Sequence, residues 1–97
     1  MDTGDLIDAV RAHRVVEIEY RGARVVHPHA VYRTASGALR LEAVQVSGAS
    51  SSGRLPGWRE FDLMQIAAVR VLDAEFAPDP GFDRDAPRYR NGVLAMA

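Results

Sequence analysis

The chain has 97 residues, of which 47% are hydrophobic, contains no cysteine and carries a formal net charge of −1. Its length predicts one domain with a small core, and its apolar content is too high for a disordered chain. The absence of cysteine excludes disulfides and thiolate chemistry, and the lack of a long apolar run or a secretion signal predicts a cytoplasmic protein with no membrane contact.

The first predicted element is a short helix over about residues 4–13. Asp2 or Thr3 can cap its N-terminus. Aspartates lie in its first half and arginines at its end, which suits the helix dipole. An apolar stripe along one side indicates the face that packs on the domain: Leu6, Ile7 and Val10.

The hydrophobic period then changes to two, which predicts a half-buried strand over about residues 15–20. Arg21-Gly22 predicts a hairpin turn into a second strand over about residues 23–34. If the turn has two residues, Glu19 lies opposite Arg24. Opposed residues share a face, so Arg24 is expected on the solvent side with a carboxylate partner.

Pro28 interrupts this second strand. Proline cannot donate a ladder hydrogen bond, so the strand is expected to lie at a sheet edge or to be bulged there. An exposed edge over Ala23 to Thr34 would be a candidate surface for self-association.

Three further strands are predicted over about residues 38–46, 58–63 and 68–76, with a serine- and glycine-rich loop at 47–57. Residues 77–97 begin with three prolines within ten residues and are predicted to form an irregular C-terminal tail. One helix followed by about five short strands predicts a mainly β fold, in the form of a small, strongly curved sheet or barrel.

Two aromatic residues of the tail, Phe82 and Tyr89, are candidates for docking it onto the domain.

No catalytic motif is present, so we expect a protein that is not an enzyme and needs no cofactor. His27 and His29 have a spacing that can place two imidazoles on one strand face, but a third ligand is missing and no metal site is predicted. The loop at 47–57 either cradles an anion beside Arg54 or simply connects two strands; it has no phosphate-loop pattern.

Charge is spread unevenly along the chain. Residues 11–59 hold eight arginines against three glutamates, whereas residues 60–85 hold seven acids against two arginines. The central excess could bind a phosphate or carboxylate, or the two segments could pair in the fold and cancel. The near-neutral total argues against a strong non-specific DNA-binding surface.

Tyr32 and Trp58 are each followed by an arginine. Surfaces that bind single-stranded nucleic acid combine aromatic rings, on which bases stack, with basic residues in this way. The alternative for Trp58, the one tryptophan, is that it fills the core.

The order of these segments resembles the WYL domain family. In that family a helix leads into a strand that ends in tyrosine, and an arginine follows with a proline four residues on; Tyr20, Arg24 and Pro28 match. Residues 59–66 resemble the family's arginine-x-phenylalanine-x-leucine segment, and the similarity covers about residues 5–76.

The chain departs from the family pattern at four positions. The tryptophan and tyrosine of the family name are Leu39 and Arg40, and two positions that are commonly basic are Asp62 and Gln65.

The resemblance implies an Sm-like or SH3-like barrel with a helical cap, acting as the sensing part of bacterial transcription regulators. It also implies that a nucleotide or single-stranded nucleic acid binds an arginine-rich pocket. Arg24 and Arg59 match arginines of the pattern, and Arg40 is added for its charge; His29 and Tyr32 are expected neighbours.

Two hypotheses follow from the sequence. The first is a non-enzymatic regulatory module that binds a nucleotide or single-stranded nucleic acid through these arginines. The alternative is a protein-interaction module that forms homo-oligomers, or pairs with a regulator, through an exposed strand edge and binds no small ligand.

Overall fold

The computed structural model describes residues 3–50 and 53–97. Asp2, one of the two candidate caps, and residues 51–52 of the serine- and glycine-rich loop lie outside the described residues. The elements, in chain order, are helix α1 (Thr3–Ala12), strands β1 (Arg14–Glu19), β2 (Ala23–Arg33), β3 (Leu39–Gly48) and β4 (Gly57–Asp62), the 3-10 helix η1 (Leu63–Gln65), strand β5 (Ala68–Glu75), the 3-10 helix η2 (Pro87–Tyr89) and strand β6 (Val93–Met96).

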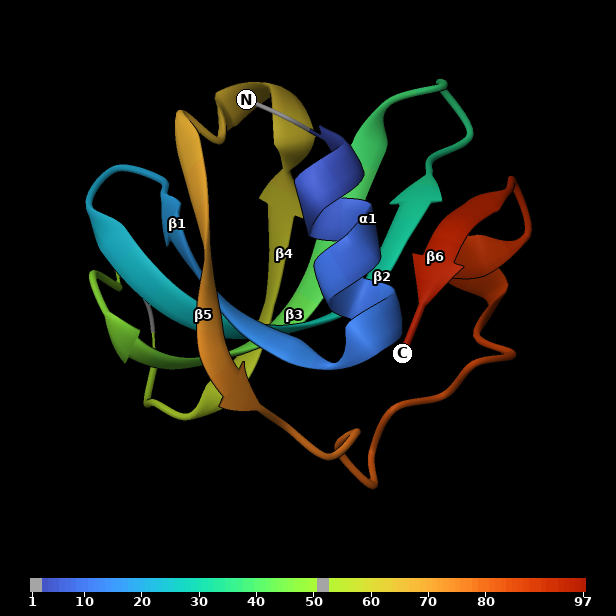
Figure 1. Cartoon of the computed structure of the whole chain (residues 1–97). Helices are drawn as coiled ribbons and strands as arrows, with labels where there is room; N and C mark the ends of the chain where they lie inside the picture. Colours follow the sequence, from blue (N-terminus) through green and yellow to red (C-terminus); the bar gives the residue numbers. More distant parts are fainter. Residues whose placement is uncertain (1–2, 51–52) are drawn as a thin grey trace.

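This arrangement confirms the predicted mainly β fold with one N-terminal helix. The strands form one curved antiparallel sheet in the order β4-β3-β2-β1-β5, and β6 pairs with β2 (Figure 1). Helix α1 lies across the sheet and buries the apolar stripe predicted from its sequence, with Leu6 and Val10 fully buried. These side chains share one core with inward-facing strand residues such as Ile18, Leu41 and Phe61.

The predicted register of the first hairpin is wrong by one residue. Glu19 pairs with Ala23 and Ile18 with Arg24, so the connecting loop has three residues instead of two. The loop closes because Arg21 and Gly22 both adopt positive φ angles, of 51° and 112°. A shift of one residue moves a side chain to the other face of a strand, and Arg24 therefore points into the domain.

Strand β2 has the bulge expected at Pro28 but lies inside the sheet. The register with β3 shifts between Pro28 and Ala30, which accommodates a residue that has no N–H. On its other side, β2 pairs first with β1 and then, beyond the bulge, with β6. The candidate oligomer edge at Ala23 to Thr34 is therefore wrong, because the β2 ladder is filled on both sides.

The C-terminal segment, residues 77–97, was predicted to be irregular; it contains the short elements η2 and β6, and its other residues belong to no helix or strand. Figure 1 shows the chain after β5 passing round the sheet and returning through η2 and β6 beside β2. The segment is held by backbone hydrogen bonds, from Arg33 N–H to the Gly92 carbonyl at 2.9 Å and from Ala97 N–H to the His29 carbonyl at 2.8 Å. Phe82 and Tyr89, the two candidates for docking the tail onto the domain, pack against Ala30 and Tyr32.

Neither α1 nor the short 3-10 helices of the described residues has the length and apolar character needed to cross a membrane.

The β3–β4 ladder has two distinct faces. Arg40 pairs with Asp62 and Glu42 with Glu60, so these four side chains share one face. The residues between them in β3 and β4, such as Leu41 and Phe61, face the α1 core. The C-terminal segment lies on the face that carries Arg40 and Glu42. We call it the tail face, and the candidate site lies there.

Candidate functional site

Arg24 is a buried structural residue. It is 6% exposed, its Nε–H donates to the Tyr20 carbonyl at 2.7 Å, and Nη1 lies 3.4 Å from the Gln45 side-chain oxygen. Its guanidinium carbon lies 5.3 Å from the centre of the Tyr20 ring and 5.8 Å from that of Phe61. These contacts explain how a charge is accommodated inside the domain.

Arg40 and Arg59 lie on opposite faces of the β3–β4 ladder. On the tail face, Arg40 forms ion pairs with Glu60 at 3.4 Å and Asp62 at 3.2 Å. Arg59 alternates with Glu60 along β4 and donates to the carbonyls of Trp58 and Arg54, at 2.8 and 3.3 Å. The three predicted arginines therefore do not meet around one anion site.

His29 and Tyr32, the two expected neighbours, both lie in the half of β2 that the C-terminal segment covers. Tyr32 is buried, donates from its hydroxyl to Glu60 at 2.6 Å and contacts the Tyr89 ring at 5.0 Å between ring centres. Burial, together with that hydrogen bond, raises the pKa of Tyr32 well above its ordinary value. The phenol therefore stays neutral at physiological pH.

His29 is fully buried and ties the C-terminal segment to the sheet. The His27 carbonyl can only accept, so the 2.8 Å contact assigns the ring proton to His29 Nδ1. Nε2 then accepts the Asp79 backbone N–H at 2.9 Å. Burial lowers the pKa of His29, which favours this neutral form.

Both nitrogens of His29 are therefore occupied by hydrogen bonds. Among residues 3–50 and 53–97, no group of three or more histidine, cysteine or acidic side chains could hold a metal ion. The spacing of His27 and His29 serves packing instead, since the His27 ring stacks on Phe76 at 4.9 Å and His29 contacts it at 5.1 Å.

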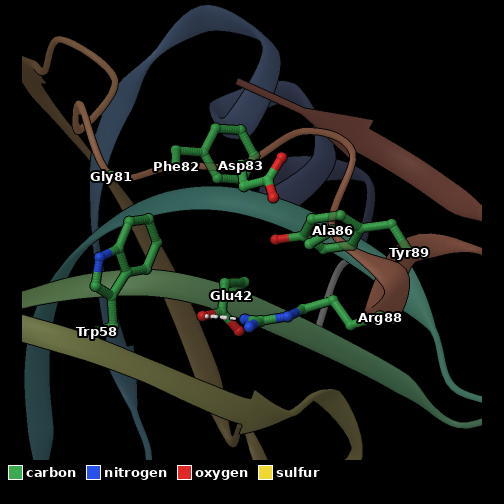
Figure 2. Close-up of a pocket in the computed structure, with 8 residues that line it drawn as sticks. All are labelled: Glu42, Trp58, Gly81, Phe82, Asp83, Ala86, Arg88 and Tyr89. Atoms are coloured by element: carbon green, nitrogen blue, oxygen red, sulfur yellow. Dashed lines mark ion pairs between the residues drawn. The ribbon is translucent and has the colours of Figure 1, made fainter.

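A pocket of about 160 Å³ opens between the β3–β4 ladder and the C-terminal segment (Figure 2). We call it the tail pocket. The strands contribute its base and the C-terminal segment its upper wall. Its lining residues are Glu42, Trp58, Gly81, Phe82, Asp83, Ala86, Arg88 and Tyr89.

Glu42 is the most unusual residue of the tail pocket. Its side chain is 8% exposed, and Oε2 forms an ion pair with Arg88 at 2.9 Å. The second oxygen, Oε1, is buried and has no hydrogen-bond partner. Burial raises the pKa of the Glu42 carboxyl, and the Arg88 guanidinium acts in the opposite direction.

Aromatic rings form the walls of the tail pocket. The Trp58 and Phe82 rings are 6.2 Å apart and close to parallel, and the Phe82 and Tyr89 rings are 6.2 Å apart at a steep angle. Figure 2 shows the Tyr89 hydroxyl and the Asp83 carboxylate directed toward the space above Glu42. Burial, followed by the charge of Glu42, raises the pKa of Tyr89 to about 12, so its hydroxyl is neutral.

The tail pocket cannot be predicted from the sequence because its walls lie far apart in the chain. The sequence indicates Phe82 and Tyr89 as docking residues and Trp58 as a core or stacking residue, but no pattern in it links them to Glu42. One local signal was available. Glu42 is flanked by Leu41 and Ala43 in a long apolar strand, where a charged residue must face either solvent or a specific partner.

In comparisons with known proteins, no family model, no curated protein and no solved structure matches the chain. The geometry of the tail pocket and the partners of the arginines are therefore the observations on which a function is inferred.

Proposed function

We propose that this chain is a non-enzymatic binding module whose ligand occupies the tail pocket. The observation that carries the proposal is Glu42, a buried carboxylate with one oxygen that lacks a hydrogen-bond partner. A buried polar group without a partner costs about 1–3 kcal/mol, and more when it is charged. Native proteins satisfy nearly all such groups, so a ligand that hydrogen-bonds Oε1 gives a reason for keeping it.

A sensing role is compatible with the resemblance to WYL domains, in which ligand binding is passed on to a transcription regulator. The arginine pocket for a nucleotide is less well supported. Arg24 is buried in hydrogen bonds, and two carboxylates neutralise Arg40. Nucleotides and single-stranded nucleic acid therefore enter the tests as competing ligands, while the tail pocket is the proposed site.

A first test uses stability, because it needs no ligand. If Glu42 is retained for binding, Glu42→Gln removes a buried charge that the fold does not need, and the melting temperature should stay the same or rise. The neighbouring Glu60→Gln is the control. Glu60 accepts a hydrogen bond from Tyr32 and pairs with Arg40, so this substitution should lower the melting temperature. A fall in melting temperature for Glu42→Gln as large as that for Glu60→Gln would make Glu42 a structural residue and overturn the proposal.

A second test locates the site. Labelled protein is titrated by NMR at about 100 mM salt with mononucleotides, short oligonucleotides and small amines, because charge-driven affinity depends steeply on salt. Shifts that cluster at Glu42, Phe82 and the Trp58 indole would support the tail pocket. Shifts at Arg40 alone, or at Arg59 alone, that appear only with nucleotides would favour an arginine site instead.

The second candidate function is a protein-interaction module, and the open ends of the sheet favour it. β4 and β5 are the terminal strands of the sheet order, and Val71 of β5 is 40% exposed. A terminal strand presents backbone groups with which another chain can pair. Light scattering at high micromolar concentration tests this, and a monomeric mass would exclude stable self-association.

A further inference from the structure

The charge of the tail pocket selects the class of ligand. Glu42 and Asp83 supply two carboxylates against the single guanidinium of Arg88, and Arg88 is already paired with Glu42 Oε2. An anionic ligand would have to compete with Glu42 for Arg88 and would meet two like charges. A cation meets a carboxylate oxygen that lacks a partner.

We infer that the tail pocket binds a primary alkylammonium group, which donates a hydrogen bond to Oε1 of Glu42. This inference rests on the proposed function, since it names the ligand class of the same pocket.

The polar groups of the pocket match the donors of such a ligand. An ammonium group has three N–H donors. The lining residues supply three acceptors, namely Glu42 Oε1, the Asp83 carboxylate and the Tyr89 hydroxyl oxygen, and Figure 2 shows the last two directed toward the space above Glu42. Asp83 Oδ1 already accepts the Asp85 N–H at 2.9 Å, so the other oxygen is the one available to a ligand.

The aromatic walls suit the rest of the ligand. A cation within about 6 Å of an aromatic ring centre is attracted to the ring face, most strongly to tryptophan. Trp58 stands beside Glu42 and Phe82 opposite, so an ammonium at Glu42 would direct its alkyl chain along apolar rings. The volume, about 160 Å³, is about ten times the roughly 15 Å³ that one water molecule needs, which leaves room for a chain of several carbons.

Other organic cations fit less well. A quaternary ammonium has no N–H and would leave Glu42 Oε1 without a hydrogen bond. A guanidinium binds a carboxylate best when two of its N–H groups donate to the two carboxylate oxygens. In Glu42 one of these oxygens, Oε2, is already occupied by Arg88. The compact ammonium, with donors that rotate freely, needs only the one available oxygen.

The test uses four ligands that share one butyl chain: n-butylamine, n-butyltrimethylammonium, n-butylguanidinium and n-butyrate. Each is titrated as its chloride or sodium salt into the full chain at pH 7.5, with sodium chloride keeping the ionic strength constant. Trp58, the one tryptophan, reports binding by fluorescence, and NMR shifts at Glu42 and Phe82 confirm the location. For so small a ligand we expect a dissociation constant on the order of 1 mM for butylamine.

We expect butylamine to bind about tenfold more tightly than the quaternary analogue and butyrate to give no saturable signal. Glu42→Gln should weaken butylamine binding at least tenfold. Glu60→Gln removes a carboxylate of the neighbouring strand outside the tail pocket and should leave the affinity within about twofold, which separates a specific contact from a general effect of charge.

The outcomes separate the two proposals. Equal or stronger binding of butyrate or the quaternary ion at the tail pocket would overturn the ammonium inference and leave the binding module intact. Absence of any butylamine response, with Glu42→Gln no less stable than wild type, would do the same. A large loss of stability in Glu42→Gln would overturn both, because Glu42 would then be a structural residue.

Discussion

The two faces of the β3–β4 ladder differ in the side chains that they bury, although neighbouring residues of one strand contribute to both. Leu41 and Ala43 face α1 in a core of apolar side chains, whereas Arg40 and Glu42 face the C-terminal segment. The tail face buries a carboxylate and, in β2, an imidazole, both of which lose hydration on folding. The first face is organised for stability. The second includes polar groups whose burial costs stability, as expected if the tail pocket is the proposed binding site.

The largest effect that tests this contrast is expected for Phe61→Ala. The Phe61 ring is buried and contacts the Tyr20 ring at 4.9 Å, so its removal leaves a cavity. We expect the free energy of unfolding to fall by about 3–5 kcal/mol. Urea unfolding followed by circular dichroism measures this.

Phe82→Ala is the matched substitution on the tail face. The ring is half-buried beside a pocket, and we expect a loss of about 1–2 kcal/mol. A loss as large as that at Phe61 would contradict the contrast, because the tail face would then carry as much packing energy as the core.

The α1-facing core could be predicted from sequence because its signal is local. Leu39, Leu41 and Ala43 recur with a period of two, which puts them on one face of a strand, and β3 and its neighbours lie within two residues of their predicted bounds. The helix stripe of Leu6 and Val10 needed only the 3.6-residue period. These patterns depend on which side chains avoid water, and the order of apolar and polar residues in the sequence shows that directly.

The rest depended on interactions that no local pattern contains. The first hairpin loop has three residues instead of two, and Arg21 adopts a positive φ within it. As a result, the Arg24 side chain lies on the opposite face of β2 from the one predicted. Strand β6 has four residues, and its pairing with β2 joins segments more than 60 residues apart. Alternation placed Glu42 opposite the core, but it could not say that the C-terminal segment covers that face.

The second prediction, with a smaller expected effect, is for Arg88→Ala, which removes the ion-pair partner of Glu42. A buried carboxylate left without its partner costs about 1–3 kcal/mol, and the half-exposed Arg88 keeps the value toward the lower end because water can take its place. Burial raises the pKa of Glu42, so protonation at lower pH relieves the cost. Thermal unfolding at pH 8 and pH 5 measures both quantities.

A double-mutant cycle isolates the pair. In Glu42→Gln the charge is gone, and adding Arg88→Ala should then cost much less than it does in wild type. Equal costs in the two backgrounds would mean that Arg88 acts through other contacts, such as its position over the Tyr89 ring at 5.9 Å.

The third prediction concerns pH and His29. Burial lowers the pKa of His29 from its ordinary value of 6.5, so the unfolded chain takes up a proton first as the pH falls through that value. The unfolded state then binds more protons, and the free energy of unfolding decreases from about pH 7 downward, by at most about 1.4 kcal/mol per pH unit. Protonation of Nε2 also removes the acceptor of the Asp79 N–H.

Three titratable groups and three rings surround this imidazole. Asp79 favours its protonation, whereas His27 and His13 oppose it, and Trp58, Phe76 and Phe82 exclude water. The comparison is therefore made between wild type and His29→Gln at each pH from 5 to 8. His27→Gln shows how much of the slope belongs to His27, whose pKa burial also lowers. Parallel curves for wild type and His29→Gln would contradict the assignment.

The smallest effect is expected for the ion pair between Arg70 and Glu17. Its N–O distance of 3.1 Å is close to the 2.9 Å between Arg88 and Glu42, and both pairs join an arginine to a glutamate. The Arg70 side chain is 69% exposed, so water and salt screen the attraction. Arg70→Ala should change the free energy of unfolding by less than about 0.5 kcal/mol. If Arg70→Ala and Arg88→Ala cost the same, burial of Glu42 would not be what distinguishes the tail face.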